Sequence, residues 1–178
     1  YPAVAVTLDA EIDLASVRGT RTVSAVDFFT GPLMTIAEPD EILTEIRFGN
    51  HVPGSAIAEM ARRHGDFALA GAACAVELDA AERVCSLRLG LFGVGSTPVR
   101  ARGAEQAASG VAAGDLDPVA VGQAAAAELS GVSDVHADAG YRRRVAGHLA
   151  GQVVARAVQG ARAVQGARAV QEARAVPG

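Results

Sequence analysis

The apolar positions of the N-terminal segment recur at every second residue, which is the period of a β-strand. Val4, Val6 and Leu8 alternate with smaller residues and predict a strand that ends near Asp9. The same alternation predicts three further strands, over residues 11–17, 20–23 and 42–48. A turn that contains Gly19 separates the first two of these strands, so we expect them to form a hairpin.

Two long apolar runs, residues 69–78 and 84–94, predict the centre of an antiparallel sheet. The polar turn at 79–83 joins them into a second hairpin. The segment before them, residues 55–63, is ambiguous. Its Ala-Glu-Met-Ala sequence favours a helix by propensity, but its apolar residues fit neither the helical nor the strand period.

The last third of the chain has helical character. A short helix is predicted over 101–109, and Asp117 followed by Pro118 is a typical helix start that opens a second helix to about Leu129. A longer helix is predicted over 139–158. Since strands precede helices, we expect an α+β domain in which an antiparallel sheet is packed with about three helices.

The C-terminus consists of a six-residue repeat, ARAVQG twice, then ARAVQE and ARAVPG, from residue 155 to 178. Six residues advance an α-helix by about 600°, so the repeated valines would fall on three different sides. The repeated glycine weakens a helix further. We therefore expect a solvated, frayed tail, with a docking arm as the alternative.

Composition limits the function classes. Half of the 178 residues are hydrophobic, enough for one packed domain or one domain plus part of another. The net charge of -4 argues against general nucleic-acid binding, and no apolar run approaches the roughly 20 residues of a membrane span. Cys74 and Cys85 lack metal-ligand spacing and lie in apolar runs. We expect both to be buried free thiols in a reducing, cytoplasmic compartment.

No stand-alone catalytic signature is present. The glycines of 90–95 follow a predicted strand, but their spacing is not that of a dinucleotide-binding loop. His136 and Asp138 resemble a metal-binding pair without distant ligands, so no metal site is predicted. The three arginines of 142–144 stand at the start of a predicted helix, where cations oppose the helix dipole, and an acidic partner would explain them.

The stretch RRHGDFALAG, residues 62–71, changes from charged to apolar at Phe67. From the residues alone, Phe67 either caps the apolar core beside it or faces a ligand.

Five segments together resemble a known family: DFFTGPLMT, EPDEILTEIRF, RRHGDFALAGAACAVELD, GVGSTPVRA and SDVHADAGYRRRVAGHL. Their order is similar to the second half of the flavin-carrying medium subunit of molybdenum hydroxylases, the relatives of carbon monoxide dehydrogenase and xanthine dehydrogenase. The resemblance runs from about residue 4 to 156. It implies that 1–49 is the truncated end of a PCMH-type FAD-binding domain and that 52–157 is a CO dehydrogenase flavoprotein C-terminal domain. Residues 158–178 form the low-complexity tail.

The resemblance also implies an oxidoreductase complex. A large molybdopterin subunit oxidises the substrate, a small subunit with [2Fe-2S] clusters relays the electrons, and FAD passes them to an external acceptor. The two glycine-rich loops that hold the FAD pyrophosphate lie upstream of the matched part. The isolated chain is therefore expected to be inactive and to lack FAD. The alternatives are a non-catalytic docking or assembly module without flavin, and an unrelated small α+β binding domain.

The resemblance names four candidate cofactor-binding residues and no catalytic one. Phe67 occupies the position of an aromatic or apolar residue that lies against the flavin ring. Leu43 matches a leucine that touches the flavin. Asp66 would orient the loop that presents Phe67, and Glu59 stands where some relatives carry lysine.

Overall fold

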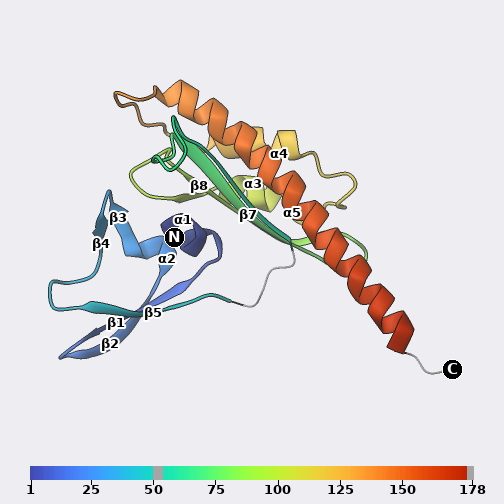
Figure 1. Cartoon of the computed structure of the whole chain (residues 1–178), viewed down its shortest axis with the longest axis horizontal. Coiled ribbons are helices and arrows are strands. Elements are labelled where there is room, and N and C mark those ends of the chain that lie inside the picture. The colour runs from blue at the N-terminus through green and yellow to red at the C-terminus, as the bar shows by residue number, and fades with distance from the viewer. Residues whose placement is uncertain (50–53, 176–178) are drawn as a thin grey trace.

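The computed structural model describes residues 1–49 and 54–175, and the predicted linker at 49–54 lies almost entirely outside this part. The chain has the expected α+β class, with two main antiparallel sheets (Figure 1). Its first part contains α1 (Pro2–Thr7), β1 (Glu11–Ser16), β2 (Gly19–Ser24), α2 (Ala25–Phe28), β3 (Phe29–Gly31), β4 (Met34–Thr35) and β5 (Ile42–Arg47). Its second part contains β6 (Gly54–Met60), β7 (Ala70–Leu78), β8 (Val84–Phe92), β9 (Val99–Arg100), α3 (Arg102–Ala108), α4 (Pro118–Ala127) and α5 (Ala139–Ala175).

The first sheet has the strand order β2-β1-β5, and the predicted hairpin between β1 and β2 is confirmed. Ile12 and Leu14 of β1 are fully buried, as their alternation predicts. They pack with Phe28 of α2 and Val6 of α1 in a small core of their own.

The strand predicted over residues 4–9 is wrong, because this segment is the helix α1. Pro2 stands in its first turn, where the missing N–H leaves no hydrogen bond unmade, and the Thr7 hydroxyl donates to the carbonyl of Ala3 at 2.7 Å. The alternation of valine and alanine fits either period over so few residues. Tertiary packing selects the helix, because α1 buries its small side chains between the core of the first sheet and the second sheet.

The second sheet has the order β6-β7-β8-β9, and the predicted central hairpin of β7 and β8 is confirmed. Its turn is fixed by Asp79, whose carboxylate accepts from the backbone N–H groups of Ala81 and Arg83. The ambiguous segment becomes strand β6 because β7 offers it a complete register, from Gly54 opposite Val76 to Met60 opposite Ala70.

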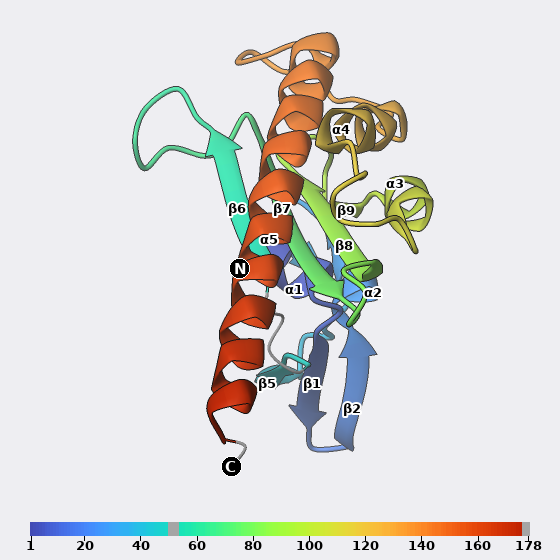
Figure 2. The same ribbon diagram turned by 90° about the vertical axis from the view of Figure 1, so that its right-hand side faces the viewer.

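Helices cover one face of this sheet. The long helix α5 crosses β6 and β7, α4 lies beside α5, and α3 packs on β8 next to α4 (Figures 1 and 2). Helix α1 packs against the sheet as well, at β7, β8 and β9. Small residues permit this close packing: a Cβ on Gly90 would overlap the Thr7 side chain, and one on Gly54 would overlap the Ala157 carbonyl.

The expectation that the C-terminal repeat forms a frayed tail is wrong, since α5 continues to Ala175. The first repeats gain contacts that the sequence pattern does not reveal. Val158 and Ala161 are buried in the main core, and the guanidinium of Arg162 pairs with Glu82 at 2.7 Å. The Gln165 amide donates to the carbonyls of Leu78 and Asp79 in the β7–β8 turn. Among the described helices, none is apolar over a length that would cross a membrane.

The two cysteines differ in environment, so the prediction that both are buried is half wrong. Cys74 is buried in the main core, and desolvation, with a smaller effect of nearby Glu105, raises the pKa of its thiol to about 12. Cys85 is a free, exposed thiol on β8. The register between β7 and β8 shifts here, because Glu77 pairs with Ser86 and Leu78 with Val84, so Cys85 lies at an irregularity that interrupts the alternation of the buried leucines.

We therefore expect a thiol reagent such as 5,5′-dithiobis(2-nitrobenzoate) to modify one thiol quickly in the folded chain and the second only in denaturant. The reagent needs an accessible thiolate, which Cys74 does not provide. Cys85→Ser should abolish the fast phase, whereas Cys74→Ala should leave it intact. A fast phase that survives Cys85→Ser would contradict the burial of Cys74.

Candidate functional site

The loop between β6 and β7, residues 61–69, presents the most exposed aromatic side chain near the second sheet. Phe67 is 95% exposed at the loop, so it does not cap the core. The chain turns through Gly65, whose φ of 80° is costly for other residues. Asp66 orders this turn, since its carboxylate accepts from the N–H of Phe67 at 2.9 Å and pairs with Arg62 at 3.3 Å. The loop therefore holds an aromatic ring in solvent on an ordered backbone.

The base of this loop is closed by hydrogen bonds on two sides. The N–H of Leu69 donates to the carbonyl of Met60 at 2.7 Å, which joins the two ends of the loop. The Leu69 carbonyl accepts from the guanidinium of Arg142 at 2.6 Å. Arg142 belongs to α5, so the loop is tied directly to the first turn of the longest helix.

The other two predicted cofactor residues lie elsewhere on the surface. Glu59 is exposed on the edge strand β6, on the face that also carries Ile57. Leu43 is exposed on β5 in the first sheet, and β5 lies far from the 61–69 loop in both views (Figures 1 and 2). The structure thus brings Asp66 and Phe67 together, places Glu59 on the strand that leads to them, and keeps Leu43 apart.

Exposed apolar side chains accompany all of these positions. On and beside β5 and β6 they are Ile42, Leu43, Ile46, Phe48, Ile57 and Met60. Large apolar groups on two successive strands are unusual on a surface that faces only water. A flat, largely apolar ring such as isoalloxazine would suit Phe67 together with the apolar residues of the adjoining strand β6, whereas the apolar residues of β5 lie far from this loop.

A buried ion-pair network connects the first part of the chain to the second sheet. The Arg100 guanidinium, with its side chain 4% exposed, binds both carboxylate oxygens of Glu105 at 2.6 and 2.8 Å. It also pairs with Asp9 at 2.6 Å and donates to the carbonyl of Val6 at 3.2 Å. Glu105 in turn accepts from the N–H of Leu89 at 2.8 Å. Sequence reasoning missed this network because Asp9 and Arg100 are 91 residues apart.

The arginines at the start of α5 find partners within the chain. Arg142 reaches backbone carbonyls, and Arg143 donates to the carbonyls of Leu129 and Ser130 beyond the end of α4, where a cation is favourable. Asp138, the expected half of a metal pair, instead caps α5 by accepting from the N–H of Tyr141. Arg142 therefore has an acidic partner within the chain, Asp134, whereas the hydrogen bonds of Arg143 among the described residues go to carbonyls. No cluster of three or more metal-ligating side chains occurs among the residues that the structure describes.

Asp134 completes the arrangement around Arg142. Its carboxylate accepts from the backbone N–H groups of His136 and Ala137 and from Arg142 at 2.6 Å. The N–H of His136, followed by the Arg142 guanidinium, lowers the pKa of Asp134 from 3.8 to about 2. A lowered pKa stabilises the fold above pH 3.8, and this contribution is lost as the pH falls towards 2. The ion pair is therefore intact at physiological pH.

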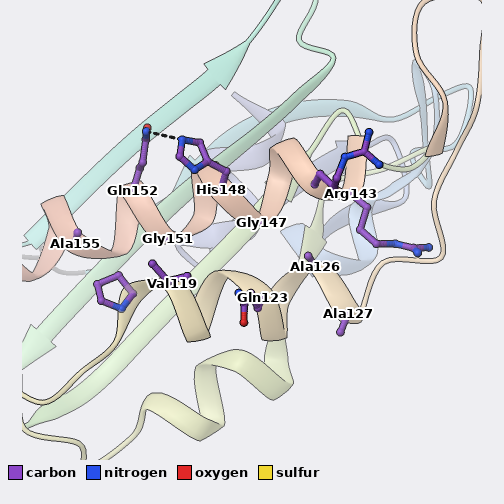
Figure 3. A pocket seen from close by; sticks show the side chains of 12 residues that line it. Val119, Gln123, Ala126, Ala127, Arg143, Gly147, His148, Gly151, Gln152 and Ala155 are labelled. Atoms are coloured by element: carbon purple, nitrogen blue, oxygen red, sulfur yellow. Dashed lines mark hydrogen bonds between the residues drawn. The ribbon is translucent and has the colours of Figure 1, made fainter. Parts of the chain in front are cut away.

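A groove of about 800 Å³ lies between α4 and α5 (Figure 3). Its lining is largely apolar, with Val119 and Ala126 on α4 facing Gly147 and Gly151 on α5. His148 stands on the α5 side, where its ring is 2.9 Å from the Gln152 amide nitrogen. Among the described residues that line the groove, none is a cysteine, serine or carboxylate that would act as a nucleophile or general base. The groove is therefore a largely apolar surface that carries one imidazole, that of His148.

Comparison with known proteins agrees with this arrangement. Residues 55–157 match the family model of the CO dehydrogenase flavoprotein C-terminal domain. The chain is 33% identical over 157 residues to the nicotine 6-hydroxylase medium subunit of Paenarthrobacter nicotinovorans, covering 88% of this chain and 55% of that protein. It is also 33% identical over 164 residues to the carbon monoxide dehydrogenase medium chain of Hydrogenophaga pseudoflava, covering 90% and 55%. The chain thus spans about half the length of these relatives.

Solved structures give the same result. Quinoline 2-oxidoreductase from Pseudomonas putida 86 superimposes with a TM-score of 0.82 at 29% identity, over 90% of this chain and 56% of that one. Carbon monoxide dehydrogenase from Hydrogenophaga pseudoflava superimposes with a TM-score of 0.82 at 32% identity, over 89% and 56%. The resemblance drawn from the five sequence segments is confirmed, and an unrelated binding domain is excluded. The chain belongs to the CO dehydrogenase flavoprotein C-terminal domain family, and its relatives are medium subunits of oxidoreductase complexes.

Proposed function

We propose that this chain acts in the flavin subunit of a molybdenum hydroxylase, where electrons pass from [2Fe-2S] clusters through FAD to an external acceptor. The observation that carries the proposal is the match of nearly the whole chain to medium subunits of such dehydrogenases, at 33% identity. The partners would be a large molybdopterin subunit and a small iron-sulfur subunit. Residues 1–49 would belong to a PCMH-type FAD-binding domain, and residues 52–157 to the C-terminal domain.

Phe67 is the residue that this function requires at the flavin. Bound FAD supplies the redox chemistry, and the chain supplies position and environment. The exposed Phe67 ring would cover one face of a bound isoalloxazine, where it would exclude water and limit the approach of the acceptor. Asp66 fixes the backbone that carries the ring. Leu43 stays a candidate flavin contact on β5, apart from the loop, and Glu59 stands within the same strand and loop unit as a candidate acceptor contact.

A docking or assembly module without its own flavin is the second candidate. The apolar groove between α4 and α5 favours it, because an open apolar surface of this kind suits contact with another chain. The two candidates differ in one property: only a flavin subunit places Phe67 against a bound cofactor.

We expect the isolated 178-residue chain not to retain FAD. Backbone N–H groups of glycine-rich loops compensate the charge of a bound pyrophosphate, and the sequence contains no such loop. The measurement is the visible absorbance of the purified chain after incubation with FAD and gel filtration. A stoichiometric yellow protein would contradict the expectation. The complementary test is to produce the chain joined to a glycine-rich FAD-binding half from a relative, where flavin should be retained.

A further inference from the structure

The 61–69 loop is held from below by one buried arginine. Arg142 is 5% exposed, although arginine is rarely buried without a specific reason. One guanidinium nitrogen, Nη1, donates to the carbonyls of Leu69 at 2.6 Å and Gly93 at 2.8 Å. The other, Nη2, donates to Asp134 at 2.6 Å. A single side chain thus joins the end of the Phe67 loop, the turn after β8 and the segment before α5.

The surroundings of this arginine are closely packed. A Cβ on Gly93 would lie 2.8 Å from the carbonyl oxygen of Ala68, so the turn after β8 presses against the loop base. Nε of Arg142 is buried and has no hydrogen-bond partner within the described residues. Arg142 therefore leaves one polar atom unsatisfied in order to reach two carbonyls and one carboxylate. An unsatisfied buried polar atom costs free energy, and such a cost is typical of a residue that fixes the relative positions of the segments it bonds.

From these contacts we propose that Arg142 is a positioning residue that clamps the base of the 61–69 loop and thereby sets the orientation of Phe67. Within the loop tip, the Asp66 contacts and the turn at Gly65 order the backbone around Phe67 as one unit, which is joined to the sheet through the loop ends. The loop ends are therefore what determine where the ring points. This inference rests on the proposed function, since it assigns Arg142 a role at the surface that would face the flavin.

The first test measures the loop without any flavin. Hydrogen exchange of the Leu69 N–H, which bonds Met60 at the loop base, reports whether the clamp is closed. In the full chain, Arg142→Gln should speed this exchange by about tenfold or more, because the loop base opens locally. Trypsin cleavage after Arg62 or Arg63 should accelerate in parallel. Arg144→Gln is the matched control: this neighbour on α5 is exposed and is not part of the clamp, so both rates should remain unchanged.

A conservative variant separates clamping from general stability. Arg142→Lys keeps a charge opposite Asp134 but lacks the fork that reaches Leu69 and Gly93 together, so its exchange rate should fall between parent and Arg142→Gln. If Arg142→Gln does not fold, the Leu69 exchange rate of Arg142→Lys alone tests the clamp. The proposal is overturned if Leu69 exchange stays within about twofold of the parent in the folded variants, or if protection falls equally across β7 and β8.

The second test asks whether the clamp acts through Phe67. In an assembled, flavin-loaded complex, Arg142→Gln should change flavin reoxidation in the same direction as Phe67→Ala. The double variant should change it no further than Phe67→Ala alone, as expected of residues that act as a unit. Additive effects would overturn action through Phe67. If the Leu69 exchange rises but reoxidation is unchanged for both single variants, the clamp is supported and the proposed flavin contact fails.

Discussion

Replacing Arg100 with methionine should lower the free energy of unfolding by about 3–5 kcal/mol, the range for breaking a buried ion pair. Arg100 is nearly inaccessible and compensates Glu105, which is itself buried, through two hydrogen bonds. Without the guanidinium, the Glu105 carboxylate stays buried with the N–H of Leu89 as its closest remaining donor. The Asp9 pair and the bond to the carbonyl of Val6 are lost as well. The measurement is urea unfolding of parent and variant, followed by circular dichroism.

The neighbouring arginine provides the control. The Arg102 side chain is 60% exposed and pairs with Asp9 at 3.4 Å and Glu105 at 3.7 Å. Exposed pairs contribute about 0–1 kcal/mol, so Arg102→Met should have a small effect. The double variant Arg100→Met with Glu105→Leu should recover part of the loss, since it removes the uncompensated carboxylate. Equal losses from Arg100→Met and Arg102→Met would show that the buried network does not stabilise the fold.

The sequence pattern located β7, β8, α3 and α4 well, for physical reasons that are local. Asp117 and Pro118 start α4 as predicted, and the Asp117 carboxylate accepts from the N–H of Val119. The β7–β8 hairpin was predicted because two apolar runs flank a turn whose Asp79 fixes its own backbone. The residues that determine these elements lie within a few positions of one another in the sequence.

Other features depended on partners far along the chain and were not predictable from the pattern. The segment of α1 alternates like a strand but packs against β8 as a helix. The repeat tail lacks an apolar stripe, yet its beginning is helical because Val158 and Ala161 reach the core. In the candidate site, Asp66 and Phe67 were identified through the resemblance. Arg142 was recognised only as part of a basic cluster, because its partner Leu69 is 73 residues away.

Phe67→Ala should change the oxidative half-reaction of the flavin by up to about tenfold, while leaving reduction at the molybdenum centre nearly unchanged. An aromatic contact contributes about 0.5–1.5 kcal/mol, and about 1.4 kcal/mol corresponds to a factor of ten in rate. The effect is confined to one half-reaction because, in the proposed function, substrate oxidation takes place in another subunit. At the proposed position, Phe67 would influence only flavin polarity, flavin retention and access of the acceptor. Since the side chain is 95% exposed in the chain, its removal should leave the unfolding free energy almost unchanged.

The most direct test of the flavin contact is therefore stopped-flow kinetics of an assembled, flavin-loaded complex that contains either the parent chain or the Phe67→Ala variant, normalised to bound flavin. Val17→Ala, a similarly exposed apolar position in the β1–β2 turn, serves as the control. We expect Phe67→Ala to change reoxidation by the acceptor and to retain reduction by the substrate, and we expect Val17→Ala to match the parent. If Phe67→Ala leaves both half-reactions at their parent rates, Phe67 does not face the flavin and the central claim is contradicted.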